Sequence, residues 1–171
     1  MTSNDSSAGT SPGTWTPGRL FRFFALSEGV TWALLLSGLA LRAVVGAPPI
    51  LVTIVGGIHG AVFLGYGVTA ALIGVNNRWG LGRTVLGIAL AIVPFATVPF
   101  ESSVSKRGLL AGEWRRAATT DPRDAHWFDR LFRWFIQRPL LLGVTLLVVI
   151  AAIFATLLSL GPPDSWFDNE S

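Results

Sequence analysis

Four long apolar stretches constrain the fold of this sequence more than any other feature. They cover residues 20–45, 49–75, 84–100 and 140–160. A helix needs about 20 predominantly apolar residues to cross the hydrocarbon core of a bilayer, so the first, second and fourth stretches predict transmembrane helices. The third stretch is shorter and is interrupted by Pro94 and Pro99, which makes it a marginal span. Together they predict an all-α, multi-pass bundle of transmembrane helices.

The composition agrees with a membrane protein and excludes several kinds of chemistry. Hydrophobic residues make up 51% of the 171 residues and charged residues only 13%, whereas a soluble domain usually has about 25% charged residues. No cysteine is present, so disulfides, thiolate metal sites and thiol catalysis are excluded. The sequence also lacks a phosphate-binding loop, a nucleophile elbow and a paired-histidine zinc motif. We therefore assign no catalytic residue, no metal ligand and no cofactor, and we favour a protein that is not an enzyme.

Changes in composition along the chain predict its organisation. Residues 1–18 are rich in Ser, Thr, Gly and Pro, which predicts a disordered N-terminal tail. The remaining chain divides into a membrane domain (19–107), a basic cytoplasmic loop (108–139), a fourth transmembrane helix (140–160) and an acidic tail (161–171). The membrane domain contains the first three apolar stretches.

The segment between the third and fourth apolar stretches gathers most of the basic residues. Within it, residues 123–138 place aromatic side chains on one helical face and charged ones on the other, which is typical of an amphipathic helix at a membrane interface. This pattern indicates anionic lipid headgroups, and not nucleic acid, as the partner. The side chains expected to contact lipid are Trp127, Phe128, Arg130, Arg133 and Trp134.

Two membrane topologies fit the basic residues, which are retained on the cytoplasmic side. If all four stretches span, both termini are outside, and nine basic residues lie inside against four outside. If the third stretch is re-entrant, the N-terminus is inside and the acidic tail outside, and the count becomes twelve against one. A re-entrant segment needs surrounding protein to satisfy its backbone, and this chain is small. We therefore expect four full spans, with the basic loop in the cytoplasm.

Besides arginines, four ionisable side chains lie within or beside the first three stretches: Glu28, His59, Tyr66 and Glu101. An ionisable group inside a membrane costs about 2.5–3.5 kcal/mol, which makes these residues candidates for a functional site. Helical register places Glu28 and Tyr66 at similar depth, where they can share a hydrogen bond, and it places His59 level with Glu101 if the third stretch spans. The alternative is that hydrogen bonds of these groups only lock helices together, assisted by Thr31 and Trp32 beside Glu28.

A row of glycines accompanies His59 and Tyr66 on one face of the second predicted helix. Small residues at such a face let a neighbouring helix backbone approach closely. The glycines expected to pack in this way are Gly56, Gly60 and Gly67.

Three motifs in this order resemble a known family of bacterial membrane proteins. They are RLFRFFALSEGVTWALLL, GGIHGAVFLGYGV and RWGLGRTVLGIALAIVPFATVPFE, which lie within residues 18–107. The chain is similar over this range to domain-of-unknown-function family 3817, and the rest resembles a C-terminal extension. The positions that match the family motifs are Glu28, Gly29, His59, Gly60, Tyr66, Trp79, Pro94 and Glu101. The resemblance implies an integral protein of the bacterial cytoplasmic membrane with about three core helices, and no particular activity.

Three classes of function remain open on these observations. The first is a non-enzymatic accessory or interaction protein of the cytoplasmic membrane, which forms a homo-oligomer or binds another membrane protein. The second is a small permease or a proton- or cation-conducting protein that uses the four ionisable residues. The third is a metal- or haem-binding membrane protein in which His59 is a ligand; it has the least support, because a metal site normally needs three or four ligands.

Overall fold

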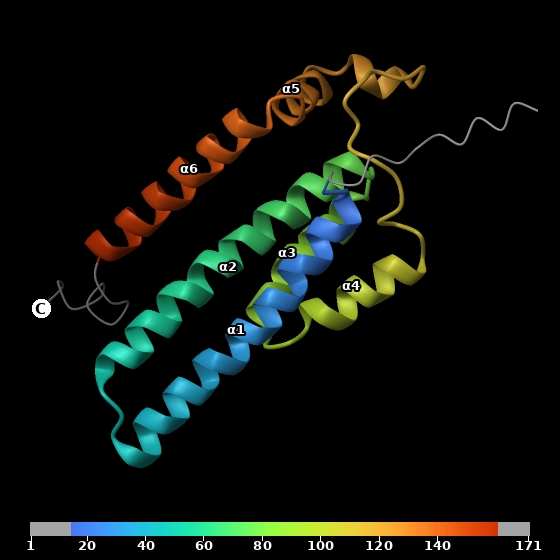
Figure 1. The fold of residues 1–171 in the computed structure, drawn as a ribbon. Coiled ribbons are helices and arrows are strands. Elements are labelled where there is room, and N and C mark those ends of the chain that lie inside the picture. The colour runs from blue at the N-terminus through green and yellow to red at the C-terminus, as the bar shows by residue number, and fades with distance from the viewer. Residues whose placement is uncertain (1–14, 161–171) are drawn as a thin grey trace, which may run out of the picture.

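The computed structural model describes residues 15–160, and every regular element in this range is helical. The elements are α1 (Pro17–Val45), α2 (Pro49–Asn76), α3 (Leu81–Ala89), the 3₁₀ turn η1 (Leu90–Ile92), α4 (Thr97–Lys106), the 3₁₀ turn η2 (Pro122–Ala125), α5 (Trp127–Ile136) and α6 (Pro139–Leu160) (Figure 1). The all-α prediction is confirmed. Residues 1–14 of the predicted N-terminal tail, and the whole acidic tail, lie outside the described residues; the predicted tail boundary at residue 18 is wrong, because α1 already begins at Pro17.

Helices α1 and α2 form an antiparallel pair whose ends follow from the sequence. Thr16 caps α1 by accepting a hydrogen bond from the Arg19 N–H at 3.3 Å, and Pro17 occupies the first helical position. Gly46 ends α1 in the left-handed conformation at φ 69°, which a residue with a side chain adopts only at a cost. Pro49 then begins α2. These local signals fix the two longest helices of the chain.

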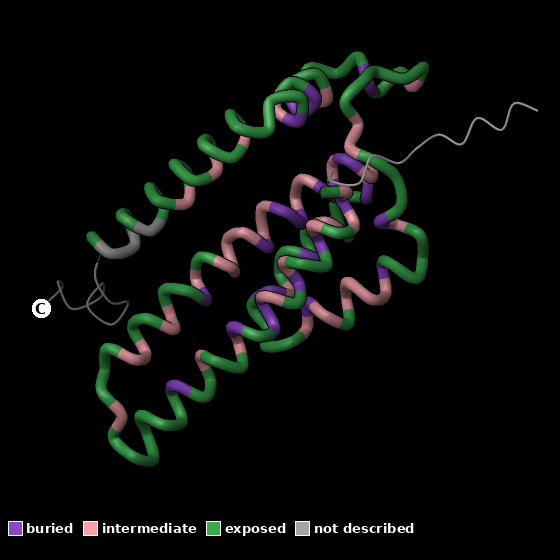
Figure 2. Tube along the Cα trace, in the orientation of Figure 1, coloured by how far each residue is buried: buried purple, intermediate pink, exposed green. Residues whose placement is uncertain are grey.

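Within the part of the chain that the structure describes, two helices, α1 and α2, are each long and apolar enough to cross a membrane. The number becomes three if α5 and the following part of α6, which meet at 103°, count as one bent span. Figure 2 shows buried residues mainly where α1, α2 and the α3–α4 segment meet, while the outer surfaces are exposed. These exposed surfaces are apolar along much of α1, α2 and α6, as expected for helices that contact lipid.

The third apolar stretch is not a continuous helix, in contrast to the predicted full span. α3 has 9 residues and measures about 13 Å, less than half of the roughly 30 Å hydrocarbon core. Val93 is extended (φ −96°, ψ 119°) because the residue before a proline avoids the helical region. After Pro94 the chain bends, and α4 packs against α1 while α3 packs against α2. Residues 81–106 therefore form a short helical hairpin (Figure 1).

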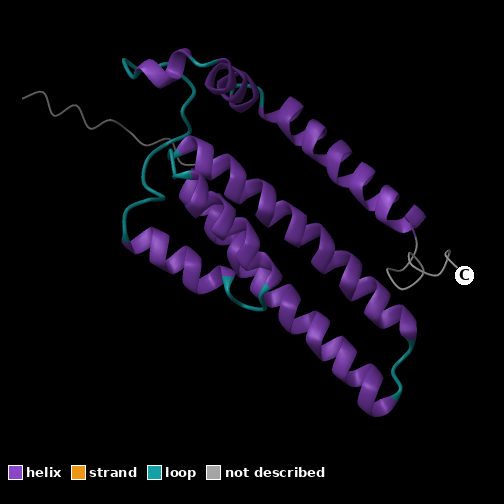
Figure 3. Ribbon diagram, turned by 180° about the vertical axis from the view of Figure 1, so that it is seen from behind, coloured by secondary structure: helices purple, strands orange, loops and turns teal. Residues whose placement is uncertain are grey.

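The hairpin places the polar segments of the chain at one end of the molecule. Figures 1 and 3 show the start of α1, the end of α2 and helix α5 at this end, and the α1–α2 connection at the other. α6 runs from α5 back toward the α1–α2 connection. Arg42, close to that connection, stands apart from the other basic residues.

Three glycines outside the predicted set, Gly65, Gly74 and Gly87, lie closest to side chains of neighbouring helices. A Cβ added at Gly74 would lie 2.4 Å from Thr84 Oγ1, and one at Gly87 would lie 2.9 Å from the Phe100 ring. By contrast, a Cβ at Gly56 or Gly67 would meet its nearest neighbour at 3.9 or 4.0 Å, an ordinary contact. A Cβ at Gly65, in the middle of α2, would lie 2.4 Å from the Phe24 ring of α1, so α2 packs most tightly at two places, against α1 at Gly65 and against α3 at Gly74.

Candidate functional site

Glu28, in the middle of α1, is fully buried against the start of α4. Its Oε2 lies 2.6 Å from the hydroxyl of Thr97, the first residue of α4, and Thr97 also has no exposed surface. The same hydroxyl lies 3.2 Å from the Ala25 carbonyl oxygen. Glu28 Oε1 has no hydrogen-bond partner. Pro94 and the bend after it bring Thr97 to this position, so the contact exists only because the third apolar stretch turns back.

Counting protons at this contact indicates the state of the glutamate. The Thr97 hydroxyl has one proton but two acceptors in reach, the Ala25 carbonyl and Glu28 Oε2. If Oε2 carries a proton, it donates to Thr97, and Thr97 donates to Ala25. Every proton then has an acceptor, and no charge is buried. The geometry therefore fits a neutral Glu28.

His59, on α2, faces α1 and bonds to Thr31. The distance between His59 Nδ1 and Thr31 Oγ1 is 3.0 Å, and the Thr31 hydroxyl also lies 3.0 Å from the Glu28 carbonyl oxygen. When this hydroxyl donates to the carbonyl, Nδ1 must carry the ring proton and donate to Thr31. The imidazole also packs against the Trp32 ring, with centroids 4.5 Å apart. His59 thus joins α2 to α1 through a hydrogen bond to an uncharged hydroxyl.

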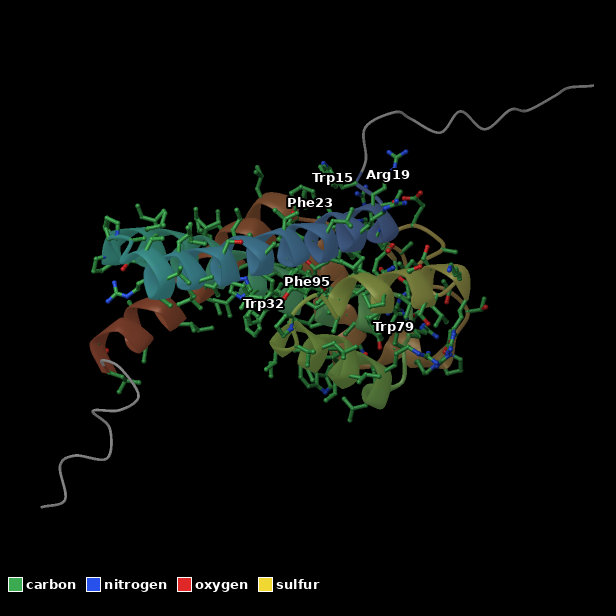
Figure 4. All side chains as sticks on the ribbon, turned by 90° about the horizontal axis from the view of Figure 1, so that it is seen from below. Trp15, Arg19, Phe23, Trp32, Trp79 and Phe95 are labelled. Atoms are coloured by element: carbon green, nitrogen blue, oxygen red, sulfur yellow. The ribbon has the colours of Figure 1, made fainter. Side chains whose placement is uncertain are left out.

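Two further side chains bond to the backbone of the hairpin. The Tyr66 hydroxyl donates to the Gly87 carbonyl at 3.0 Å, and Trp32 Nε1 donates to the Ala91 carbonyl at 3.2 Å. Both carbonyls lie where α3 ends, and the last carbonyls of a helix lack partners inside it. Figure 4 labels Trp32, on α1, and Phe95, at the bend of the hairpin. α1 and α2 thus supply the bonds that the interrupted segment cannot make itself.

The structure gives two predicted pairs different partners. Tyr66 bonds to the Gly87 carbonyl and not to the Glu28 carboxyl group. His59 bonds to Thr31 and not to Glu101. Glu101 is carried away from His59 because α4 turns back along α1, and it lines a separate hollow with Arg19, Arg22 and Ser105. Of the four ionisable residues, Glu28, His59 and Tyr66 lie within the α1–α2–hairpin packing, and Glu101 lies outside it.

An arginine–aspartate cluster at the end of α2 was not predicted. Asp124 Oδ1 lies 2.6 Å from Arg78 Nη2 and 2.9 Å from Arg115 Nη1, and Arg133 Nη1 lies at 3.3 Å. The backbone N–H and the hydroxyl of Thr119 each donate to Asp124 Oδ2 at 2.7 Å. These Thr119 bonds, and after them the charges of Arg78 and Arg115, hold the pKa of Asp124 well below its usual range.

Arg115 connects this cluster to the end of α2. It donates to the Val75 and Asn76 carbonyl oxygens, each at 2.8 Å, and so bonds to the last carbonyl groups of the helix. Its Nη2 also lies 2.9 Å from Asp129 Oδ1 on α5. Three aspartates among the arginines of residues 115–133 were the available sequence signal. Part of the positive charge predicted for lipid contact is therefore neutralised within the protein.

Helix α5 is shorter than the predicted 123–138, and its faces are divided between solvent and protein. Trp127, Phe128 and Trp134 are exposed, and Arg130 is exposed beside them. Arg133 is buried, because its Nη2 donates to the Asp124 carbonyl oxygen at 2.7 Å. Arg133 therefore belongs to the buried cluster, and its predicted role as a lipid contact does not agree with this position.

Comparison with known proteins gives a consistent outline. Residues 18–106 match a family model described as Domain of unknown function (DUF3817). A protein of Streptomyces coelicolor, named "Putative membrane protein SCO5905", is 38% identical over 93 residues, which cover 54% of this chain and 11% of that protein. The chain thus spans about a tenth of the length of this relative. No solved structure matches. The family match ends where α4 ends, so α5 and α6 follow the shared domain.

Proposed function

Because this chain belongs to the DUF3817 family, in which residues 18–106 match, we propose that α1–α4 form a membrane unit of the bacterial cytoplasmic membrane. In this proposal α1, α2 and α6 cross the bilayer, and the α3–α4 hairpin enters and leaves on the same side. The relative from a bacterium and the two apolar helices of spanning length support this placement. The bonds from Tyr66 and Trp32 to the Gly87 and Ala91 carbonyl oxygens supply backbone cover of the kind that a re-entrant segment requires.

The positions of the basic residues support one orientation for this unit. All except Arg42 lie at the start of α1, between α2 and the first turn of α3, or after residue 105. With the hairpin re-entrant, these segments share one side of the membrane. Basic residues are retained on the cytoplasmic side, so the start of α1 and helix α5 lie there, and α6 leads to the outside.

We infer that the protein acts as a non-enzymatic accessory or interaction protein of this membrane. One observation carries this inference: the intramembrane polar side chains bond to the hairpin and to each other, so their geometry is that of a helix-locking set. The remaining contact surfaces are the exposed apolar faces of α1, α2 and α6, which are available to lipid, a second copy or another membrane protein.

One observation favours a second candidate, a proton- or cation-conducting protein. Glu28 Oε1 is buried without a partner, and a carboxyl group in this position can accept or release a proton if the packing opens. His59 lies close to the same segment of α1 through Thr31. In this alternative Glu28 and His59 accept and release protons, or bind cations, along a conduction path.

Flux through liposomes separates the two candidates. The purified chain is reconstituted with a pH-sensitive dye inside, and wild type is compared with Glu28→Gln, His59→Ala and the exposed control Thr53→Val. The accessory role predicts that wild type passes no more protons or cations than empty liposomes, while His59→Ala lowers the unfolding temperature. A pH-dependent flux that disappears in Glu28→Gln and His59→Ala, in variants that still fold, would overturn the accessory role and establish conduction.

A further inference from the structure

The outward face of α5 combines large apolar side chains with arginine. Trp127, Leu131 and Trp134 are 70%, 44% and 42% exposed, and their spacing of four and three residues places them on one face. Together with Arg130 they line a shallow hollow. Contiguous exposed apolar surface with a polar rim marks an interaction site. This face therefore has the composition of an interaction surface.

Two arginines beside this face are held in place without losing their charge. Arg130 Nε and Nη2 donate to the Ala125 carbonyl oxygen at 3.1 and 2.9 Å, which leaves Nη1 free. The Arg138 guanidinium lies over the Trp134 ring, 4.5 Å from its centroid. Within residues 15–160, neither arginine forms an ion pair with a carboxylate. Both remain available to an anion.

The opposite face of α5 fixes the direction in which these groups point. Phe132 and Ile136 are 6% and 7% exposed, and Arg133 is tied to Asp124. This anchoring prevents the helix from rolling. α5 also meets α6 at 103°, so a spanning α6 leaves α5 nearly parallel to the membrane plane, at the height of the headgroups.

We propose that the outward face of α5 binds the anionic phospholipid headgroups of the cytoplasmic leaflet. Trp127, Leu131 and Trp134 enter the interface, where tryptophan is enriched, and Arg130 and Arg138 contact lipid phosphates. Charge complementarity and the direct continuation of α5 into the apolar α6 support lipid over a protein as the occupant. The proposal rests on the membrane placement above. It concerns α5 and does not depend on the hydrogen bonds that join α1, α2 and the hairpin.

The absence of cysteine makes a direct test simple. Leu131→Cys introduces a single site for a bimane label in the full-length chain, which is reconstituted in nanodiscs. Quenching of the label is compared between brominated phosphatidylglycerol and brominated phosphatidylcholine at equal mole fractions. The anionic lipid is expected to quench more strongly. The preference of the protein for the anionic lipid should weaken about fivefold for each arginine removed, since one arginine near an anionic leaflet contributes about 1 kcal/mol. It should also weaken as salt is added.

Two double variants and one control measurement decide the result. Arg130→Gln with Arg138→Gln should quench equally with both lipids. Lys106→Gln with Arg107→Gln loses the same charge at the exposed end of α4 and should keep the preference. Equal quenching by both lipids in the parent protein, insensitive to salt, would overturn the proposal, as would an unquenched label, which indicates water or a protein at this face. Flotation of the same protein with vesicles tests the membrane placement separately: a protein that does not float is not in the membrane, whereas one that floats but shows no lipid preference contradicts only the proposal for α5.

Discussion

Between α1, α2 and the hairpin, each polar side chain meets one or two neutral partners, whereas at the end of α2 a single aspartate meets three arginines. In the first region Glu28 bonds to Thr97, and His59 bonds to Thr31. In the second, Asp124 approaches Arg78, Arg115 and Arg133 within 3.3 Å. Both regions hold segments together that are far apart in the sequence, but they do so with different chemistry.

The difference follows from the surroundings expected for each region. In the hydrocarbon core a charge is costly and water cannot replace a lost bond, so neutral hydrogen bonds suit this depth. At the membrane surface, water and counterions lower the cost of charge, and a cluster of several ion pairs can form. Hydrogen bonds between uncharged groups thus hold the hairpin, whereas ion pairs hold α5.

Among the substitutions considered, removal of the Asp124 carboxylate should have the largest effect, because it disrupts the arginine–aspartate cluster. In Asp124→Ala three arginines face each other without their common acceptor, so α5 should detach and its amides should lose their protection completely. Hydrogen exchange with mass spectrometry in nanodiscs measures this, and protection in α1 and α2 should be unchanged. Glu113→Ala, at an exposed acid in the same loop, is the control. Retained protection of α5 would show that the apolar contacts of Phe132 and Ile136 hold the helix alone.

Lowering the pH should also destabilise the arginine–aspartate cluster before it destabilises the packing of α1, α2 and the hairpin. The pKa of Asp124 in the folded protein lies below its ordinary value of 3.8, so its contribution to stability is fully present above that value. The contribution is lost as the pH falls from about 4 toward the lower folded-state pKa. Protection of α5 should thus be constant from pH 7 to 5 and fall in stronger acid, before that of α1 and α2. Simultaneous loss in both regions would contradict this separation.

A substitution in the neutral region should have a smaller but measurable effect. Thr97→Val keeps the shape of the side chain but removes the hydroxyl that contacts Glu28 and the Ala25 carbonyl. The free energy of unfolding should fall by about 1–2 kcal/mol, the contribution of interhelical hydrogen bonds in membranes. Titration with sodium dodecyl sulfate in mixed micelles measures it. Thr53→Val, at an exposed threonine on α2, should change it much less; equal losses in both variants would remove the special role of Thr97.

The ends of the long helices could be predicted from the sequence because local signals determine them. Residues 20–45, 49–75 and 140–160 were predicted, and the helices run Pro17–Val45, Pro49–Asn76 and Pro139–Leu160. Gly46 ends α1, and proline occupies the first turn of each of the three helices, which are signals that act wherever a helix packs. The third stretch shows the limit of such signals. Pro94 indicates where the helix ends, but the direction after it depends on contacts with α1.

The sequence predicted individual residues of the site but not their bonding partners. Glu28, His59 and Tyr66 stand out because ionisable groups are rare in apolar helices, and Thr31 and Trp32 were noted as donors near Glu28. Their bonding partners include backbone carbonyls at the end of α3, which carry no sequence signature. Thr97 was missed because its approach to Glu28 requires the hairpin. The Asp124 cluster was missed because the basic residues were treated as free charges.

The smallest expected effect tests whether the inner region is neutral at all. In Glu28→Gln the side-chain amide can donate to Thr97 as a protonated carboxyl group does, so the free energy of unfolding should change by less than about 0.5 kcal/mol. Infrared difference spectra should show the carbonyl band of a protonated carboxylic acid in wild type and its loss in the variant. A stabilisation of several kcal/mol would contradict the neutral state, because relief of that size requires the removal of a buried charge. The two regions would then both depend on charge, and the burial of Glu28 would become a functional feature and not a helix-locking one.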